Sequence, residues 1–319
     1  MGLLVNGIWN EEDQQPQGTN GRFVRPGSQF RHWVTNDGST EFPAETGRYH
    51  LYIAISCPWA HRTWIFRKLK RLENVISMSI VAPRRTAHGW VFDNHSSQYR
   101  DTLLGKVALY EIYTLAQSDY SGRVTVPVLW DKKQGTIVNN ESSDIIRMFN
   151  SAFAALVPDT PDYYPASLRT EIDALNDLIY HGLNNGVYRA GFATTQEAYE
   201  EAVSAVFATL DRLEARLATQ RYLIGNQLTE TDWRLFPTLV RFDCAYYGAF
   251  KCNVKRIVDY PNLWAYTREL YQQPGIAETV DIEIFKRGYY SPSPQRNPLG
   301  IVPKGPIIDF SAPHGRSLH

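Results

Sequence analysis

The segment YHLYIAISCPWAHRT, residues 49–63, carries the strongest indication of the fold. Every second residue from Leu51 to Ile55 is aliphatic, and this alternation is typical of a β-strand. Cys57 follows the strand. Pro58 suits the first position of a helix, because its fixed φ is helical and its missing N–H would have no partner there. The sequence therefore predicts a thiol at the N-terminus of a helix.

A thiol in this position faces unpaired backbone N–H groups and the positive end of the helix dipole, which favour thiolate over thiol. The alternative for any free cysteine is a buried structural role. The order strand, Cys, Pro, helix resembles the thioredoxin fold, but Ala60 stands where a second cysteine would complete C-x-x-C. A lone thiol cannot close an internal disulfide, so it must form a mixed disulfide with an external thiol, which points to glutathione.

The composition excludes several functional classes. The chain has 319 residues, 43% of them hydrophobic, with 33 basic and 33 acidic side chains. This length favours two domains, and the charge balance argues against nucleic acid or an anionic membrane surface as a partner. The three cysteines, Cys57, Cys244 and Cys252, make no disulfide framework, which favours a reducing, cytoplasmic compartment. There is no signal-peptide pattern and no apolar run of about 18 residues, so we expect an unsecreted protein without a membrane span.

The chain is predicted to contain five parts. They are an ordered N-terminal extension (1–47), a thioredoxin-like α/β domain (48–155) with an insertion at about 82–122, a linker (156–165), an all-helical C-terminal domain (166–288) and a C-terminal extension (289–319). The linker is predicted from Pro158, Pro161 and Pro165.

Within the α/β domain, the first strand leads into a helix that reaches about Leu72, and a strand over 75–81 completes a βαβ unit. Residues 124–130 and 136–138 are predicted to form a strand pair, and a helix opens over 139–144.

Helical spacing dominates the second half of the chain. Apolar residues three or four apart run over 172–183 and over 203–217. A third helix is predicted to begin at Thr229, where Asp232 has the position of the partner in a capping box. A fourth covers 263–271.

Two further segments are candidates for binding a peptide-like ligand. If the fold is thioredoxin-like, Val126-Pro127 is a cis peptide that exposes backbone groups for β-type pairing; an ordinary loop proline is the alternative. Glu141 and Ser142, at a helix start, can hold the ammonium and carboxylate of a γ-glutamyl group, although they can also be a simple solvated cap. Arg123 can pair with a ligand carboxylate.

Tyrosines are candidates for the acceptor side. Tyr188, Tyr246 and Tyr289 stand where predicted helices end or break, and their phenols can donate to a thiolate or a substrate oxygen, although core packing is the commoner role. The eight histidines and three cysteines form no metal-ligand spacing, so no metal site is predicted. No nucleotide-binding or nucleophile-elbow motif occurs.

The chain resembles the glutathionyl-hydroquinone reductases, also called Xi-class glutathione transferases, over nearly its whole length. The resemblance is carried by SCPWAHRT (56–63), GRVTVPVLW (122–130), VNNES (138–142), NNGVY (184–188), TDWRLF (231–236) and NPLGIVP (297–303). It implies a glutathione-transferase fold, a homodimer, and reduction of S-glutathionyl-hydroquinones to hydroquinones with glutathione as co-substrate.

The resemblance also implies roles for individual residues. Cys57 would be the nucleophile, Tyr188 the proton donor or acceptor, and Tyr246 and Tyr289 would lie near Cys57 and favour its thiolate. The glutathione-binding residues would be Trp90, Arg123, Val124, Thr125, Val126, Glu141 and Ser142.

The chain departs from the family pattern at Gly288, Ser293 and Ala249, which leaves the choice between Tyr289 and Tyr290 open.

Two other functions stay open at this point. One is an omega-class-like thiol transferase or dehydroascorbate reductase, which would share Cys57 and the glutathione site. The other is a non-catalytic binding module with the same fold, which would tolerate loss of Cys57.

Overall fold

The computed structural model describes residues 2–11, 18–157 and 159–316. By its internal contacts the chain divides into two units. The first contains Met1–Gln15 and Gly27–Pro161, and the second contains Pro16–Pro26 and Asp162–His319. The domain boundaries expected from the sequence stay predictions, and Pro158 of the predicted linker lies outside the described residues.

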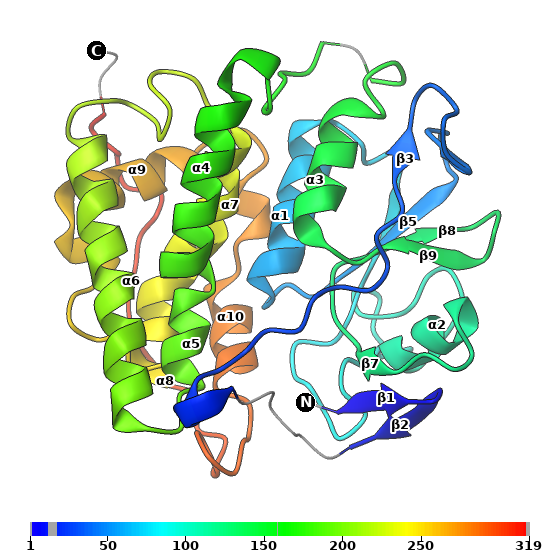
Figure 1. The fold of residues 1–319 in the computed structure, drawn as a ribbon, viewed down its shortest axis with the longest axis horizontal. Helices are drawn as coiled ribbons and strands as arrows, with labels where there is room; N and C mark the ends of the chain where they lie inside the picture. Colours follow the sequence, from blue (N-terminus) through cyan, green and yellow to red (C-terminus); the bar gives the residue numbers. More distant parts are fainter. Residues whose placement is uncertain (1, 12–17, 158, 317–319) are drawn as a thin grey trace. The chain divides into compact units, whose positions relative to one another are not determined.

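The first unit is built on a four-stranded sheet in the order β6-β5-β8-β9 (Figure 1). Its strands are β5 (Tyr49–Ile53), β6 (Ser77–Ile80), β8 (Val128–Asp131) and β9 (Thr136–Asn139). β5 and β6 are parallel and are joined through helix α1 (Pro58–Leu69), whereas β8 is antiparallel to both β5 and β9. The predicted βαβ unit and strand pair are therefore confirmed, and the topology is thioredoxin-like.

Helices α1 and α3 (Ser142–Ser151) pack side by side, and α2 (Leu109–Ala116), within the predicted insertion, contacts β9 (Figure 1). All five residues of β5 are buried, and not only the expected alternate ones, because β5 is an interior strand between β6 and β8 and α1 packs against it.

The predicted strand over 124–130 is wrong in its first half. The chain forms the two-residue strand β7 (Gly122–Arg123), leaves the ladder, and resumes as β8 at Val128. Pro127 has no N–H to donate to a strand partner, which explains why regular pairing starts only after it.

The N-terminal segment adds short strands to the first unit. They are β1 (Leu3–Val5), β2 (Ile8–Asn10), β3 (Val34–Thr35) and β4 (Phe42–Pro43). β1 pairs with β2 and with β7, while β3 and β4 pair with each other. The sequence predicted order in this segment but no strands, because two- and three-residue strands are too short to show a period.

The second unit is helical. Its α-helices are α4 (Arg169–Ile179), α5 (Gly186–Gly191), α6 (Gln196–Leu217), α7 (Glu230–Arg241), α8 (Tyr247–Ala249), α9 (Pro261–Tyr271) and α10 (Ile282–Tyr289). Two π-helical turns, Tyr180–Asn184 and Phe242–Tyr246, follow α4 and α7. The helix expected over 172–183 thus continues past α4 as a π-turn, and widened turns of this kind are frequent at functional sites.

Asp232 fixes the start of α7 as predicted. Its carboxylate reaches back to the Thr229 N–H at 2.8 Å, and it also accepts bonds from the Thr229 hydroxyl, the Leu223 N–H and the Tyr266 hydroxyl. The capping box is present, and it ties the loop before α7 and helix α9 to the same buried carboxylate.

His50 makes the stability of the first unit depend on pH. Its ring is 1% exposed in β5 and bonds through its two nitrogens to the hydroxyls of Ser77 (2.7 Å) and Ser79 (2.9 Å). Burial lowers the pKa of His50 from 6.5 to about 4. Between pH 6.5 and pH 4, His50 is therefore protonated in the unfolded chain but neutral in the folded chain. Because the unfolded state binds more protons, the free energy of unfolding falls as the pH drops from 6.5 towards 4. The loss attributable to His50 at pH 4 is about 3 kcal/mol.

A His50→Asn variant should lose this part of the acid sensitivity. We expect its free energy of unfolding, measured by denaturant titration from pH 7.5 to 4.5, to fall by about 2 kcal/mol less than that of the wild type. The exposed His95 is the matched control, because His95→Asn should retain the wild-type slope. A His50→Asn variant with an unchanged slope would contradict this account.

Candidate functional site

Cys57 caps the N-terminus of α1, with extended backbone angles, and Pro58 is the first helical residue. This confirms the predicted strand-Cys-Pro-helix arrangement. The Cys57 side chain is partly exposed, and its Sγ lies 3.6 Å from the carbonyl oxygen of Val126. The Val126-Pro127 peptide is cis, as predicted. The thiol and the backbone of the second candidate segment are therefore neighbours, although 69 residues separate them in sequence.

The other two cysteines are not comparable with Cys57. Cys244 and Cys252 are free and buried. Burial raises the pKa of each thiol to about 12, so both remain protonated at neutral pH. Among the three thiols, Cys57 is the one that is partly exposed and that stands at the N-terminus of a helix.

Tyr113 connects the Val126 segment to the start of α3. Its hydroxyl donates to the carbonyl of Thr125 (2.8 Å) and accepts the Thr125 N–H (3.2 Å) and an Asn140 side-chain N–H (3.1 Å). Burial raises the pKa of Tyr113, so the phenol stays protonated and can donate and accept at once. A single side chain thus fixes the spacing between two of the predicted glutathione-binding segments.

Glu141 and Ser142 stand at the start of α3, where Glu141 is the cap residue and Ser142 the first helical residue. The Glu141 carboxylate accepts the Ser143 N–H (3.2 Å), the Ser143 hydroxyl (3.0 Å) and the Ser28 hydroxyl (3.0 Å). Burial by itself would raise the pKa of Glu141, but these hydrogen bonds and the charge of Arg62 outweigh it, and the pKa is lowered. Glu141 is therefore a carboxylate at neutral pH.

Trp90 and Arg123 lie on either side of α2 in sequence. Trp90 is 5% exposed, and the guanidinium of Arg85 covers its ring at 4.1 Å from the ring centre. Arg123 belongs to β7, and its carbonyl accepts a bond from the Tyr120 hydroxyl. Val124 and Val126 are buried, and Thr125 bonds to Tyr113 as described. The side chains of the two valines are therefore not available to a ligand, and this stretch can bind one mainly through backbone groups.

Three tyrosines form a hydroxyl chain within the helical unit. The Tyr289 hydroxyl lies 2.6 Å from that of Tyr188 and 3.0 Å from that of Tyr246. Tyr246 is the last residue of the second π-turn, and Tyr289 is the last residue of α10. Tyr188 lies on α5, the helix that follows the first π-turn after Asn185. Phe250 packs against all three rings. Helix ends and π-turns thus bring together the three tyrosines that the sequence singled out.

The geometry also distinguishes Tyr289 from Tyr290. Tyr289 joins the hydroxyl chain, whereas the Tyr290 hydroxyl lies against Gly248, where a β-carbon would be 2.2 Å from its oxygen. Burial raises the pKa of Tyr246 and Tyr289 well above the ordinary value, so both are protonated phenols rather than phenolates at neutral pH.

Several residues of these sites were not singled out by the sequence. They are Ser28, Tyr113, Asn140 and Phe250. Asn140 had a signal, because it stands inside the VNNES motif; the other three depend on contacts between distant parts of the chain. Among the residues that the structure describes, no group of three His, Cys, Asp or Glu side chains could hold a metal ion, and none of the described helices has the length and apolar character needed to cross a bilayer.

Comparison with known proteins identifies the family. Residues 56–152 match the N-terminal domain of glutathione S-transferases, and residues 196–269 match their C-terminal domain. The chain is 52% identical to the glutathionyl-hydroquinone reductase YqjG of Escherichia coli K12, covering 100% of this chain and 99% of that protein. It is 50% identical to the glutathionyl-hydroquinone reductase PcpF of Sphingobium chlorophenolicum, with 96% of each covered.

Solved structures agree with these sequence matches. The glutathione-bound structure of YqjG has a TM-score of 0.89 at 51% identity and covers 98% of each chain. A Xi-class glutathione transferase from Natrialba magadii has a TM-score of 0.92 at 46% identity, covering 99% of this chain and 96% of that one. The chain described above, with its thioredoxin-like unit and its helical unit, therefore belongs to the Xi-class glutathione transferases, the glutathionyl-hydroquinone reductases.

Proposed function

We propose that this protein reduces S-glutathionyl-hydroquinones to hydroquinones and oxidises glutathione in doing so. The observation that carries the proposal is Cys57, a lone, partly exposed thiol at the N-terminus of α1 beside the Val126 carbonyl. This is the chemistry of a protein that forms a mixed disulfide with an external thiol and lets a second external thiol resolve it.

The reaction balances in two steps. The Cys57 thiolate attacks the glutathionyl sulfur, the carbon–sulfur bond to the ring breaks, and the ring carbon takes the electron pair and a proton, which gives hydroquinone and a Cys57–glutathione disulfide. The thiolate of a second glutathione, which has given up its proton, then attacks the glutathione sulfur of that disulfide. Oxidised glutathione leaves, and the Cys57 thiolate is regenerated.

The glutathione moiety is proposed to lie along the Cys57 unit. Backbone groups of Val126 would pair with its peptide, Glu141 would bind its ammonium group, and Ser142 with the first N–H groups of α3 would bind its γ-glutamyl carboxylate. Trp90 and the stretch from Arg123 to Thr125 would complete the binding residues. The charge of Glu141 and its place at the helix start support this assignment.

The tyrosine cluster is proposed to supply the proton to the departing ring. Tyr188 is the donor in this scheme. The hydroxyl of Tyr289 bonds to that of Tyr188 and to that of Tyr246, and this chain holds the donor in place. Because burial keeps Tyr246 and Tyr289 protonated at neutral pH, their hydroxyls can donate hydrogen bonds within this chain. We further propose that the enzyme is a homodimer and acts in the cytoplasm, where glutathione is reduced.

A single-turnover experiment tests the reaction. When the protein is mixed with a glutathionyl-hydroquinone and no free glutathione, intact-mass spectrometry should find one glutathione on Cys57 and one equivalent of free hydroquinone. Hydroquinone release without the adduct, or an adduct on Cys244 or Cys252, would refute the scheme. Parallel turnover with dehydroascorbate distinguishes the omega-like alternative, for which that substrate would be the faster one, and absence of both reactions would favour a binding module.

A further inference from the structure

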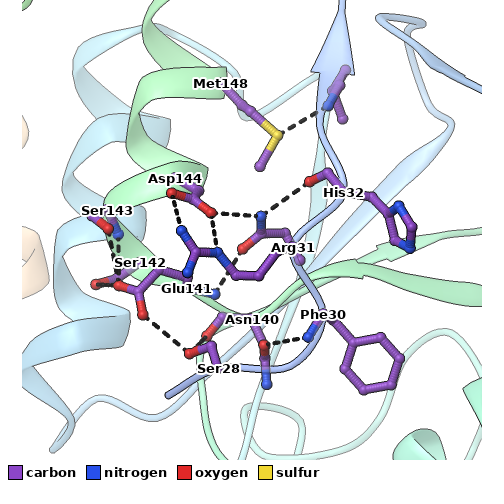
Figure 2. A network of polar contacts seen from close by, with 12 residues as sticks. Ser28, Phe30, Arg31, His32, Asn140, Glu141, Ser142, Ser143, Asp144 and Met148 are labelled. Atoms are coloured by element: carbon purple, nitrogen blue, oxygen red, sulfur yellow. Dashed lines mark hydrogen bonds and ion pairs between the residues drawn. The ribbon is translucent and has the colours of Figure 1, made fainter. Parts of the chain in front are cut away.

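The segment Ser28–His32 of the N-terminal extension extends the sheet of the first unit at its β9 edge. Arg31 pairs with Asn139 in antiparallel register, the His32 N–H donates to the Val138 carbonyl (3.0 Å), and the Asn140 N–H donates to the Phe30 carbonyl (3.1 Å). Figure 2 shows this segment running beside the start of α3, with the side chains of Ser28 and Arg31 pointing toward the residues that open that helix and those of Phe30 and His32 pointing away from it. An edge strand that would otherwise expose its backbone groups is thus paired.

Side chains hold the segment in register. The Arg31 guanidinium makes two bonds to the Asp144 carboxylate, at 2.5 and 3.0 Å (Figure 2). Asp144 also accepts an N–H from the Asn139 side chain at 3.1 Å. Further along, the Val34 N–H donates to the Met148 sulfur at 3.0 Å. These contacts reach the first and second turns of α3, so the segment and the helix are attached at several points.

The end of this attached segment bonds to Glu141. The Ser28 hydroxyl lies 3.0 Å from Glu141 Oε2 and 3.3 Å from the Asn140 carbonyl, and its single proton favours the shorter, charged partner (Figure 2). Both Ser143 bonds go to the other carboxylate oxygen, Oε1. The two carboxylate oxygens therefore accept hydrogen bonds from different parts of the chain. Oε1 accepts from Ser143 of α3, and Oε2 accepts from Ser28, which is 113 residues away in sequence.

We propose that Ser28 is a positioning residue for glutathione, holding the Glu141 carboxylate in the orientation that receives the ammonium of the γ-glutamyl group; this inference rests on the proposed function. A carboxylate has about four acceptor sites, so the bond from Ser28 leaves Oε2 able to accept a ligand N–H. With Ser28 absent, Glu141 is held only as the cap of α3 and must be reoriented when glutathione binds.

Ser28→Ala and Ser28→Thr test the proposal. Binding of S-methylglutathione and of its des-amino analogue, S-methylated glutaryl-Cys-Gly, is measured by calorimetry at pH 7. We expect Ser28→Ala to weaken S-methylglutathione about tenfold, the scale of one hydrogen bond to a charged group, and to leave the des-amino analogue unchanged. Ser28→Thr keeps the hydroxyl and should restore most of the affinity. In turnover, Ser28→Ala should raise KM for glutathione while kcat is kept.

Two further variants complete the design. Ser39→Ala changes an exposed serine of the same N-terminal segment and should bind both ligands as the wild type does. Glu141→Gln should itself weaken the binding of S-methylglutathione. Adding Ser28→Ala to Glu141→Gln should lower the affinity no further, because the Ser28 effect acts through the Glu141 charge.

The outcomes separate the two proposals. If Glu141→Gln weakens S-methylglutathione and Ser28→Ala does not, or if Ser28→Ala weakens both ligands alike, the positioning role of Ser28 is wrong. If Glu141→Gln has no effect, the assignment of the γ-glutamyl site is wrong and the role of Ser28 is overturned with it. The reaction at Cys57 would still be tested independently by the single-turnover adduct.

Discussion

A Cys57→Ser variant is expected to lose glutathionyl-hydroquinone reduction by roughly a thousandfold or more in kcat/KM. A serine hydroxyl is not ionised near neutral pH, and it cannot form the disulfide through which glutathione leaves. No other thiol can substitute, because burial raises the pKa of Cys244 and Cys252 to about 12. The measurement is steady-state release of hydroquinone with glutathione in excess.

The control for this experiment separates chemistry from binding. Cys57→Ser should bind S-methylglutathione with near wild-type affinity, since the groups proposed to hold glutathione are unchanged. Cys252→Ala removes a buried thiol outside the proposed site and should keep the wild-type rate. A Cys57→Ser enzyme that turns over at the native rate would rule out the mixed-disulfide scheme.

An Asp232→Ala variant is expected to be the most destabilised of the substitutions discussed here, by about 4 kcal/mol. The Asp232 side chain is fully buried and accepts four hydrogen bonds, from Leu223, from Tyr266 and twice from Thr229. Alanine leaves all four donors without this acceptor and leaves a cavity between α7 and α9. Scanning calorimetry should find the unfolding transition of the helical unit about 10 °C lower.

Asp232→Asn and Asp177→Ala refine this test. Asparagine keeps one acceptor oxygen, but its NH₂ group faces either the donors of Leu223 and Tyr266 or those of Thr229. The free energy of unfolding of Asp232→Asn should therefore lie between those of the wild type and Asp232→Ala. Asp177 lies on α4 with its side chain 77% exposed, and its replacement by alanine should change the free energy of unfolding by less than about 0.5 kcal/mol. If Asp232→Ala unfolds like Asp177→Ala, the buried carboxylate does not stabilise the helical unit.

Local rules predicted much of the first unit correctly. Cys57 as helix cap, Pro58 as first helical residue and the helix start at Glu141 all depend on neighbours within a few residues, where sequence pattern and backbone geometry are tightly linked. The same holds for Thr229 and Asp232. The cis peptide at Pro127 was predicted from the expected thioredoxin-like fold instead. Predictions failed where a competing local effect was overlooked, as in residues 124–127, where proline delays the strand.

The contacts between distant residues could not be predicted in the same way. Tyr188 and Tyr289 are 101 residues apart and Tyr246 and Tyr289 are 43 apart, and each of the 19 tyrosines is an equally good candidate by its chemistry alone. Only the folded helices select Tyr289 over Tyr290, since one residue of difference turns the side chain by about 100° around the helix axis.

The amino-acid sequence alone was enough to predict a lone thiol at a helix N-terminus, a thioredoxin-like unit and a helical unit, and it contains the motifs of the family. These follow from spacing and from short-range geometry, which the chain carries in its local order. The tertiary structure decided which side chains support the reactive ones, including Tyr113 between Thr125 and Asn140 and Ser28 on Glu141. Those pairs form because sheet register and helix packing bring remote segments within hydrogen-bond distance of each other. A local sequence pattern does not contain this information, because it describes only residues that are close in sequence.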